Sequence, residues 1–486
     1  MSNVPKEIKK INEVTWEIPT SFKEGMNVPA RIIATEPLLK AMDPGVFNQV
    51  TNVATLPGIV KYSICHADGH WGYGFPIGGV AAFDMEEGVI SPGGIGFDIN
   101  CGMRLVKTNL TIKEVQPKIK ELVDTLFKTV PAGVGCKGFV KLDNSQFNEI
   151  METGSKWCIE NGYGWQKDLE RTEDYGTLKG ADSKKVSQKA LSRGINQLGT
   201  LGSGNHYLEI QVARAENIFD EKTAKRLGVF DKDQILVMFH CGSRGFGHQN
   251  ATDYLKIFDR VMREHNIKVP DRELSCAPFQ SKEGQDYYSA MKCAGNMAYA
   301  NRQVILHRIR EGFQKVFNQD PEKLGMDLIY DCTHNLAREH KIKVDGKMKK
   351  VLVHLKGATT SAGPDYERLT KPYKDLGSPI ILGGSMETGS YLLLGTKKAE
   401  EETFATTAHG SGRTMSRTKA KKTIRGENLQ KKMEEKGIYV RGVSMSGLAE
   451  EAGFAYKQID DVIDSINKAG ISKPIIKLSP IGNVKG

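Results

Sequence analysis

Short apolar runs recur along the chain and predict buried β-strands. Each run is rich in Val, Ile and Leu and is bounded by Gly or polar residues, which is typical of strands inside a fold. The runs are GGVAAF at 78–83, QILVMFH at 234–240, DLIYD at 327–331, KKVLVHL at 349–355, SPIILGG at 378–384 and SYLLLG at 390–395. We therefore expect central β-sheets built from these segments.

Between these runs, apolar residues at three-to-four spacing predict amphipathic helices. The helical segments are residues 112–130, 222–227, 254–265 and 286–317. Both patterns together predict a mixed α/β (α+β) fold whose central β-sheets are flanked by helices. No strand leads into GxxxxGK[ST], and GxGxxG does not occur in a Rossmann context, so neither a P-loop nor a Rossmann unit is expected.

The chain shows no obvious internal boundary. No Pro/Gly/Ser-rich linker, low-complexity tract or repeat divides its 486 residues, which favours a single large domain over 1–486 with helical insertions. The N-terminal segment lacks the apolar core of a signal peptide, and no stretch approaches the roughly 20 apolar residues of a membrane span. A soluble, cytoplasmic protein with no membrane contact is expected.

Net charge and cysteine spacing indicate possible partners of the protein and the state of its thiols. The formal net charge is +10, and Lys and Arg gather between Arg413 and Lys432. This run predicts either an acidic polymer as partner or simply a solvated basic helix. The eight cysteines form no CxxC pair, so reduced thiols are expected, and a special cysteine would be a ligand rather than half of a disulfide.

Two clusters near the N-terminus combine glycine with potential ligands. CHADGHWGYGFPIGG contains His66, Asp68 and His70, which are either ligands and acid/base groups or residues that fix a Gly-rich turn. SPGGIGFDINCGMR places Asp98 and Cys101 three residues apart, so that a carboxylate and a thiolate can reach one ion from a tight turn. A lone Cys would more often be a core residue.

Three further clusters place a histidine at a strand end or glycine turn. In LGTLGSGNHYLEI, His206 precedes a strand that points Tyr207 and Glu209 to the opposite face. QILVMFHCGSRGFGHQ ends a strand at His240 and continues into a glycine loop with Ser243 and Arg244, suited to a phosphate.

The fifth cluster, DLIYDCTHNLAREH, ends a strand near His334, while His340 is expected to face elsewhere on a helix. With Asp98 and Cys101, the three strand-end histidines supply enough donors for two metal ions if the thiolate bridges them. Thiolate and imidazole by themselves favour zinc. The histidines at 248, 265, 307 and 354 are expected to be structural.

The segment FATTAHGSGRTMSR suggests covalent catalysis. An imidazole nitrogen of His409 is a competent nucleophile toward phosphorus, and Arg413 and Arg417 would neutralise charge on the phosphoryl oxygens. A further metal ligand is the alternative role for His409. Nearby, LKGATTSAGP and ILGGSMETGSYLLLGT offer backbone amides and hydroxyls, including Ser385, that can hold phosphates.

One motif is typical of a different class of ligase. KVDG, from Lys343 to Gly346, matches the lysine motif of ligases that form a lysine nucleotidyl intermediate, but the other motifs of that superfamily do not follow. IKVDGKMKKVLVHL is better explained as a hairpin whose Asp-Gly turn joins two alternating strands.

These clusters together resemble the RtcB family of RNA ligases. GFDINCGMR, GSGNHYLEI, HCGSRGFGHQ, THNLA, GGSMETGSYLL and AHGSGRTMSR occur in the order of that family, and the match runs nearly end to end. The resemblance implies an RtcB-type fold and the joining of 2′,3′-cyclic phosphate or 3′-phosphate RNA ends to 5′-hydroxyl ends. It implies GTP as cosubstrate, two Mn²⁺ as cofactors and tRNA exon halves as the RNA. An activating partner such as archease, the oligomeric state and RNAs beyond tRNA are left open.

The resemblance also implies roles for individual residues. His409 would take GMP, Glu209 would recognise guanine, and Asp68 is the candidate acid or base. The implied Mn²⁺ ligands, with Cys101 bridging, are Asp98, Cys101, His206, His240 and His334. The implied remainder of the nucleotide pocket is Asn205, Tyr207, Arg244, Ser385, Gly410, Tyr456 and Lys485. Tyr207 departs mildly from the family, where phenylalanine is common, and Lys485 requires the C-terminus to fold back into the site.

Two other functions compete at this point. A metal-dependent phosphodiesterase acting on RNA would need the Cys101 cluster but no nucleophile at His409. A basic RNA chaperone would need neither.

Overall fold

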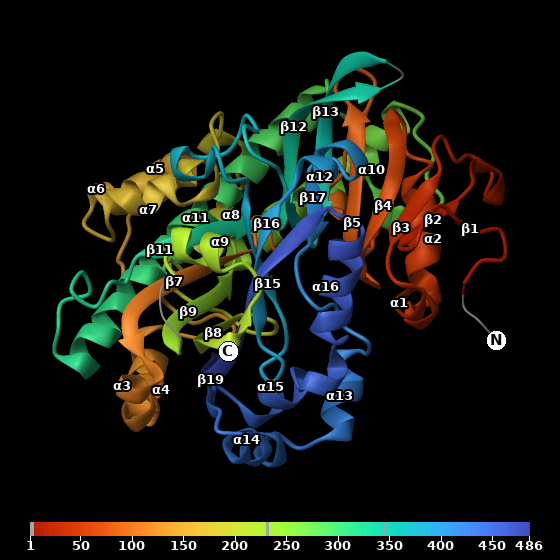
Figure 1. The fold of residues 1–486 in the computed structure, drawn as a ribbon. Coiled ribbons are helices and arrows are strands. Elements are labelled where there is room, and N and C mark those ends of the chain that lie inside the picture. The colour runs from red at the N-terminus through yellow and green to blue at the C-terminus, as the bar shows by residue number, and fades with distance from the viewer. Residues whose placement is uncertain (1–3, 230–232, 345) are drawn as a thin grey trace.

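Two mixed β-sheets form the centre of the protein, and helices cover them (Figure 1). The computed structural model describes residues 4–229, 233–344 and 346–486. In order across the first sheet, the strands are β1 (Lys9–Lys10), β2 (Thr15–Ile18), β3 (Ala30–Ile33), β4 (Ile59–His70), β5 (Ile77–Asp84), β13 (Lys347–Lys356) and β12 (Asn335–Val344). Its neighbours are antiparallel except for the parallel pair β3 and β4.

The second sheet contains the end of the chain in its middle. In order, its strands are β11 (Leu328–Thr333), β7 (Gly102–Thr111), β9 (Gln234–Cys241), β8 (Tyr207–Ile218), β19 (Ser472–Lys485), β16 (Ser390–Gly395) and β15 (Pro379–Gly383), and β18 (Tyr439–Gly442) pairs with β19 off this path. Because β19 lies between β8 and β16, Lys485 pairs with Tyr207. Two short ribbons join β6 (Val89–Ile90) to β10 (Ala277–Pro278) and β14 (Ala358–Thr360) to β17 (Thr406–Ala408).

Helices surround the sheets (Figure 1), and the long α11 contributes to two parts of the core. Their bounds are α1 (Glu36–Ala41), α2 (Pro44–Val53), α3 (Ile112–Val115), α4 (Ile119–Thr129), α5 (Asn144–Thr153), α6 (Ser155–Glu160), α7 (Gln166–Glu170), α8 (Gln188–Gly194), α9 (Glu221–Arg226), α10 (Arg244–Glu264), α11 (Lys282–Phe317), α12 (Lys397–Glu402), α13 (Arg417–Thr423), α14 (Gly426–Glu435), α15 (Met445–Glu450) and α16 (Ile459–Lys468). Tyr287 of α11 packs in the cluster beside α5 and α10, whereas Phe313 packs against α4 and β8. Within the described residues, no helix combines the length and apolar character needed to cross a membrane.

The predicted fold class is confirmed, and so are the predicted strands. All six apolar runs lie in β5, β9, β11, β13, β15 and β16. The two strands that flank the KVDG turn pair with each other, and Val344 lies opposite Lys347. Asp345 itself lies outside the described residues.

Three local predictions were wrong. The helix predicted over 112–130 is interrupted by a 3₁₀ turn at Gln116–Lys118, because Pro117 lacks a backbone N–H and its ring does not fit the interior of an α-helix. His340 lies on β12, opposite Val351 of β13, so the hairpin pairing overrides the predicted helix.

The third correction concerns the segment after His240. Helix α10 begins at Arg244, ten residues before the predicted start, so the expected glycine loop is reduced to Gly242 and Ser243. Glycine at 247 is required because a Cβ there would lie 2.0 Å from the Ser243 hydroxyl and 3.3 Å from the amide of Ile99. The glycines of this motif therefore bring α10 against the turn that carries Asp98.

Candidate active site

A cavity of about 880 Å³ lies among residues from strands of both sheets. It brings together side chains that are hundreds of residues apart in the chain. Of the predicted site residues, its lining contains Asp98, Cys101, Asn205, Tyr207, Glu209, His240, His334, Ser385, His409, Gly410, Arg413, Arg417, Tyr456 and Lys485. Asp68, His206 and Arg244 lie outside this lining.

Cys101 is shared by two groups of potential metal ligands. Cys101, His240 and His334 form one group, and Asp98, Cys101 and His206 form the other, with the ligand atoms of each group within 4.8 Å of one another. The Sγ atom lies 3.1 Å from Nε2 of His240 and 3.3 Å from Nε2 of His206. The chain thus places one thiol between two groups of potential ligands, which is the arrangement that a bridging thiolate would need.

Two of the three histidines in these groups, His206 and His240, are oriented by backbone carbonyls. Nδ1 of His206 donates to the oxygen of Leu201 at 2.9 Å, and Nδ1 of His240 donates to Asn205 at 3.2 Å. Nε2 of His240 therefore presents a lone pair toward Cys101, which is the arrangement found around metal-bound imidazoles. Nε2 of His206 also lies 2.9 Å from Oδ2 of Asp98, and although burial would lower the pKa of His206, Cys101 and Asp98 raise it well above its ordinary value. Burial lowers the pKa of His240 well below its ordinary value, which keeps that imidazole neutral and able to bind a cation.

The thiol of Cys101 requires a cation to become a strong ligand. Cys101 is 3 % exposed, and burial together with the charge of Asp98 raises its pKa to about 12. A bound divalent cation would reverse this shift, because it favours the thiolate. The donor set therefore fits two metal ions.

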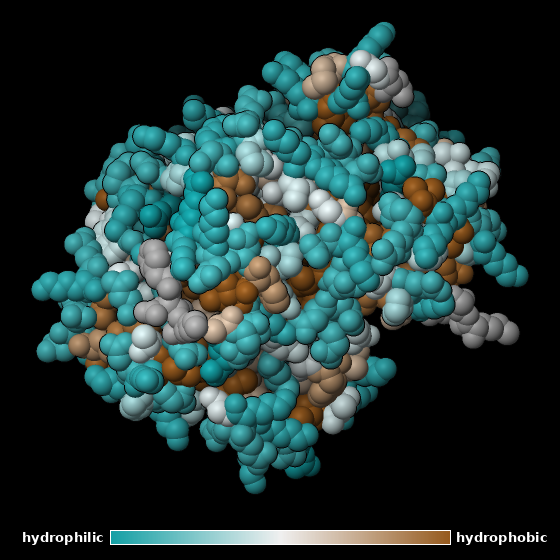
Figure 2. Space-filling view, in the orientation of Figure 1, coloured by the Kyte–Doolittle hydropathy of each residue, from teal (hydrophilic) through white to brown (hydrophobic). Residues whose placement is uncertain are grey.

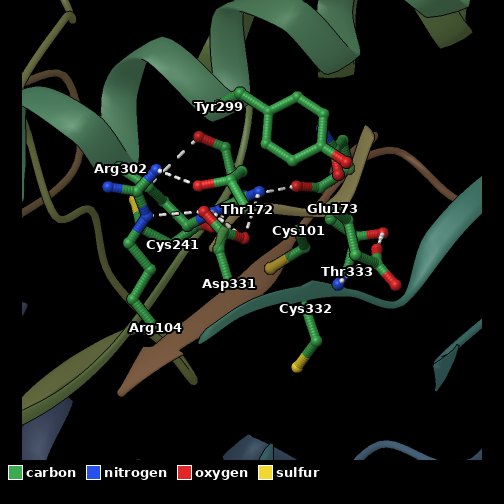
Figure 3. A network of polar contacts seen from close by, with 12 residues as sticks. Cys101, Arg104, Thr172, Glu173, Cys241, Tyr299, Arg302, Asp331, Cys332 and Thr333 are labelled. Atoms are coloured by element: carbon green, nitrogen blue, oxygen red, sulfur yellow. Dashed lines mark hydrogen bonds and ion pairs between the residues drawn. The ribbon is translucent and has the colours of Figure 1, made fainter. Parts of the chain in front are cut away.

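A buried polar network behind Cys101 holds the loops that carry the ligands (Figure 3). Asp331 accepts from Nε of Arg302 and from Nε of Arg104. Through its NH1 group, Arg302 donates to the carbonyls of Asn100 at 2.7 Å and Cys241 at 3.0 Å. These carbonyls directly neighbour two ligand positions, so the network positions both loops from inside the core.

His409 follows β17 and faces the first metal-ligand group. Its ring centroid lies 4.6 Å from that of His334. Nδ1 lies 2.7 Å from Oδ2 of Asp68, which also accepts from the amide of His409 at 3.1 Å. Burial would raise the pKa of Asp68, but the hydrogen bond and charge of His409 lower it below its usual value. The ionised carboxylate can only accept, so Nδ1 carries the hydrogen, and in the neutral imidazole Nε2 carries the lone pair.

The predicted phosphate-binding arginines converge on a buried carboxylate. Arg413 donates to Glu451 at 3.3 Å, and Arg417 donates to the same carboxylate at 3.2 Å. Lys485 lies 3.7 Å from this carboxylate. Burial would raise the pKa of Glu451, but these charges and the hydroxyl of Tyr456 lower it to about 2. Three cationic side chains therefore meet at one buried carboxylate, and Arg417 also lies 3.8 Å from Glu450.

Glu209 lies in the floor of the cavity, with both carboxylate oxygens engaged. Asn483 donates to Oε1 at 2.6 Å and Gln211 donates to Oε2 at 2.7 Å. Burial raises the pKa of Glu209 to about 7, against the opposing effect of these hydrogen bonds and of Lys485. Its protonation is thus poised near neutral pH.

Comparison with known proteins gives the family of this chain. The family model described as "tRNA-splicing ligase RtcB" matches residues 49–486. The chain belongs to the RtcB family. It is 50% identical to the tRNA-splicing ligase RtcB of Archaeoglobus fulgidus over 484 residues, which cover 100% of both chains. It is 50% identical to that of Thermococcus kodakarensis over 480 residues, 99% of each chain, and 48% identical to that of Pyrobaculum aerophilum over the full length of both.

Membership in the RtcB family confirms the resemblance and the expectation that the chain is a ligase. One predicted site residue of this RtcB chain is placed differently from expectation. Arg244 has a left-handed backbone (φ 58°) and donates to the Thr200 hydroxyl at 3.1 Å and to the oxygen of Gly133 at 3.2 Å. It lies outside the cavity lining, next to Gly202 and His206.

Sequence reasoning missed several polar residues in the lining of the RtcB cavity or directly behind it. Glu451 and Asn483 carry no motif signal, because their importance depends on partners far away in the chain. Lys356 lines the cavity, donates to the oxygen of Tyr73 and has its pKa lowered to about 7 by burial. Its position directly after a predicted strand and before a Gly turn was a usable signal.

Proposed function

We propose that this chain joins RNA ends that carry a 2′,3′-cyclic phosphate or a 3′-phosphate to 5′-hydroxyl ends, in tRNA splicing and RNA repair, through a guanylylated His409. The family and its full-length relatives are tRNA-splicing ligases, which supports the ligation of tRNA by this chain. The observation that carries the proposed mechanism is the contact between His409 and Asp68. It leaves Nε2 as a nucleophile inside a cavity that holds metal ligands and cations.

Asp68 acts as the orienting partner of His409 in this proposal. It is fully buried behind His409 and outside the cavity lining, which favours orientation over the acid or base role toward water expected from the sequence. A carboxylate on Nδ1 fixes the tautomer and stabilises the imidazole as it acquires positive charge. Lys457, which donates to the carbonyls of Ala67 and Gly69 on either side of Asp68, holds this turn in place.

The two proposed Mn²⁺ ions would be held by Cys101 with His240 and His334, and by Cys101 with Asp98 and His206. Bound metal would act as a Lewis acid toward phosphoryl oxygens. Manganese rather than zinc follows from the family and not from the softness of the donors.

The proposed order of steps is the one that the family resemblance implies. A cyclic phosphate is first opened by water to a 3′-phosphate. Nε2 of His409 attacks the α-phosphorus of GTP, and the bond to pyrophosphate breaks. An oxygen of the RNA 3′-phosphate then attacks the phosphorus of the GMP-histidine, and the N–P bond breaks to give an RNA 3′-pp-5′-G end. The 5′-hydroxyl finally attacks the RNA phosphorus of this activated end, and GMP leaves.

The nucleotide pocket has complementary chemistry at both ends of GTP. Arg413, Arg417 and Lys485 surround Glu451 and would face the phosphates. Glu209 in its ionised form would accept hydrogen bonds from N1 and N2 of guanine, which adenine does not present together. Asn205, Tyr207, Ser385, Gly410 and Tyr456 complete the proposed pocket.

Labelling with α-labelled GTP and Mn²⁺ tests the nucleophile. The protein should acquire an acid-labile, alkali-stable adduct, and His409→Ala should acquire none. Asp68→Asn should label more slowly by about a hundredfold or more, because the amide supports the wrong tautomer. His265→Ala changes an exposed histidine and is the matched control, with normal labelling expected. Labelled His409→Ala would refute the proposal, and RNA cleavage without any protein adduct would favour the phosphodiesterase.

A further inference from the structure

A second hollow, of about 850 Å³, lies beside α13 and α14. We call it the basic groove and define it by Lys421, Lys422, Arg425, Lys431, Lys432 and Phe454 in its lining. The end of the molecule formed by α14 is covered mainly by hydrophilic side chains (Figure 2). The groove contains the basic run for which the sequence left two explanations, an acidic polymer or solvent alone.

The groove is a fixed surface because α14 is anchored from behind. Leu429 and Met433 of α14 are buried against Val440 and Leu448 in a separate apolar cluster. The groove-facing positions of α14, Lys431 and Lys432, alternate with these apolar positions at helical spacing. The cations are therefore displayed in a defined arrangement and not on a frayed segment.

The charges in the groove are mostly uncompensated. Lys421 pairs with Glu450 at 2.8 Å. Lys422, Arg425, Lys431 and Lys432 form no ion pair within the part of the chain that the structure describes, and Glu435 is the carboxylate in the lining. Like charges gathered on one surface repel one another, and a polyanion that displaces its counterions relieves that repulsion.

Phe454 adds an aromatic surface to this basic lining. Its side chain is 40% exposed and belongs to a 3₁₀ turn, Gly453–Ala455. An exposed ring beside several cations is the combination with which proteins bind single-stranded nucleic acids, because bases stack on the ring while cations follow the phosphates.

Two segments of the chain connect the groove to the active-site cavity. Arg417, in the cavity lining, and Lys421, in the groove, are four residues apart on α13, which corresponds to about 6 Å along the helix axis. Phe454 lies in the groove, and Tyr456, two residues later, lines the cavity. A strand lying in the groove would therefore lead toward His409.

We propose that the basic groove binds the sugar–phosphate backbone of the RNA strand whose end reacts in the cavity, with a base stacked on Phe454. The identity of the polymer rests on the proposed function, whereas the groove itself is defined by its own charges and shape. Recognition is of backbone and stacking, so it is independent of RNA sequence.

The test compares two fourfold variants with the unmodified protein. The groove variant is Lys422→Ala, Arg425→Ala, Lys431→Ala and Lys432→Ala. The matched control is Lys341→Ala, Lys343→Ala, Lys347→Ala and Lys350→Ala, on the exposed β12–β13 hairpin at the opposite end of the molecule (Figure 1). Binding of a long single-stranded RNA with a 3′-phosphate is measured against salt concentration, and labelling of His409 by GTP is measured without RNA.

The groove variant should bind RNA at least about tenfold more weakly at low salt. The slope of log affinity against log salt should become shallower by about 0.7 for each RNA phosphate that the protein no longer neutralises. Its KM for long RNA should rise while joining of trinucleotides and GTP labelling stay unchanged. Phe454→Ala should weaken binding about fivefold or more, and Phe454→Tyr should restore it. Unchanged RNA binding and slope in the groove variant, or an equal loss in the hairpin control, would overturn the proposal. Absence of GTP labelling in the unmodified protein would instead overturn the proposed mechanism.

Discussion

Cys101 and Cys276 show how surroundings decide the role of a residue. Both thiols are buried, and burial raises the pKa of each to about 12. Cys276 lies in the apolar core, whereas Cys101 has two imidazole nitrogens within 3.3 Å and a carboxylate in the same group. The same side chain therefore packs in the apolar core at one position and belongs to two groups of potential metal ligands at the other.

Replacing the shared ligand tests this difference. Cys101→Ser should weaken Mn²⁺ binding by at least about tenfold and suppress guanylylation, because a hydroxyl is a poorer bridge than a thiolate. Calorimetric titration with Mn²⁺ and circular dichroism measure the two effects, and the fold should be retained. Cys276→Ser is the control and should leave Mn²⁺ affinity unchanged. Global unfolding of Cys101→Ser would favour a purely structural cysteine.

Glu209 should give the reaction a dependence on pH. Its pKa is raised to about 7, so the carboxylate is present above this pH and becomes protonated as the pH falls through it. A protonated Glu209 no longer accepts from both N1 and N2 of guanine. The KM for GTP in the labelling step should therefore rise as pH falls from about 8 to about 6.

Glu209→Gln serves as the reference for this profile. It should bind GTP weakly at every pH, so the part of the pH dependence that disappears in the variant belongs to Glu209. An identical profile in both proteins would assign the titration to another group.

At the scale of elements, the ligand loops depend on a salt-bridge network between α11, β7 and β11. Arg104, Arg302 and Asp331 are fully buried, and Arg302 connects the network to the backbone on either side of the metal ligands. Two buried guanidinium groups rely on one carboxylate for charge compensation. The network therefore couples packing of the long helix to the geometry of the site (Figure 3).

Asp331→Asn should disrupt both the packing of α11 and the geometry of the site. Loss of the buried counter-charge should cost about 3–5 kcal/mol of folding free energy, and Mn²⁺ affinity should fall because Arg302 is no longer held. Chemical denaturation and metal titration measure these effects. Asp375→Asn breaks an exposed ion pair with Arg226 and should change neither. Normal Mn²⁺ affinity in a folded Asp331→Asn protein would show that the network does not position the ligands.

At the scale of the whole molecule, the site is assembled from both sheets. His70 at the end of β4 and Lys356 at the end of β13 come from the first sheet, whereas Tyr207 and Lys485 come from the second. Since the last strand is inserted between β8 and β16, the second sheet is complete only when the C-terminal segment has joined it. We propose that residues 1–486 form one domain and fold as one cooperative unit.

A shortened chain tests this proposal. A protein that ends at Ile471 lacks β19, which exposes the edges of β8 and β16 and removes Lys485 from the cavity. It should fail to fold cooperatively and should aggregate, because unpaired central strands template association. The full-length protein should unfold in a single calorimetric transition. Two separate transitions, or a folded shortened chain, would contradict the proposal.

Local patterns in the sequence were enough to predict strands β5, β9, β11, β13, β15 and β16 and much of helices α4, α9, α10 and α11. Alternation and apolar runs act through near neighbours, so β9 and β15 could be predicted, as could the Asp98 and Cys101 turn. The family resemblance supplied the roles that no local pattern contains, including manganese and the guanylylated histidine.

Only the tertiary structure decided which groups meet. Asp68 and His409 are 341 residues apart, and nothing in either segment indicates the hydrogen bond between them. The same holds for Glu451 beneath Arg413 and Arg417, and for Asn483 on Glu209, because electrostatic and hydrogen-bond partners depend on distance in space. The secondary structure predicted for His340 and for the segment that begins at Arg244 was wrong for the same reason: strand pairing and close helix packing are non-local interactions that override local propensity.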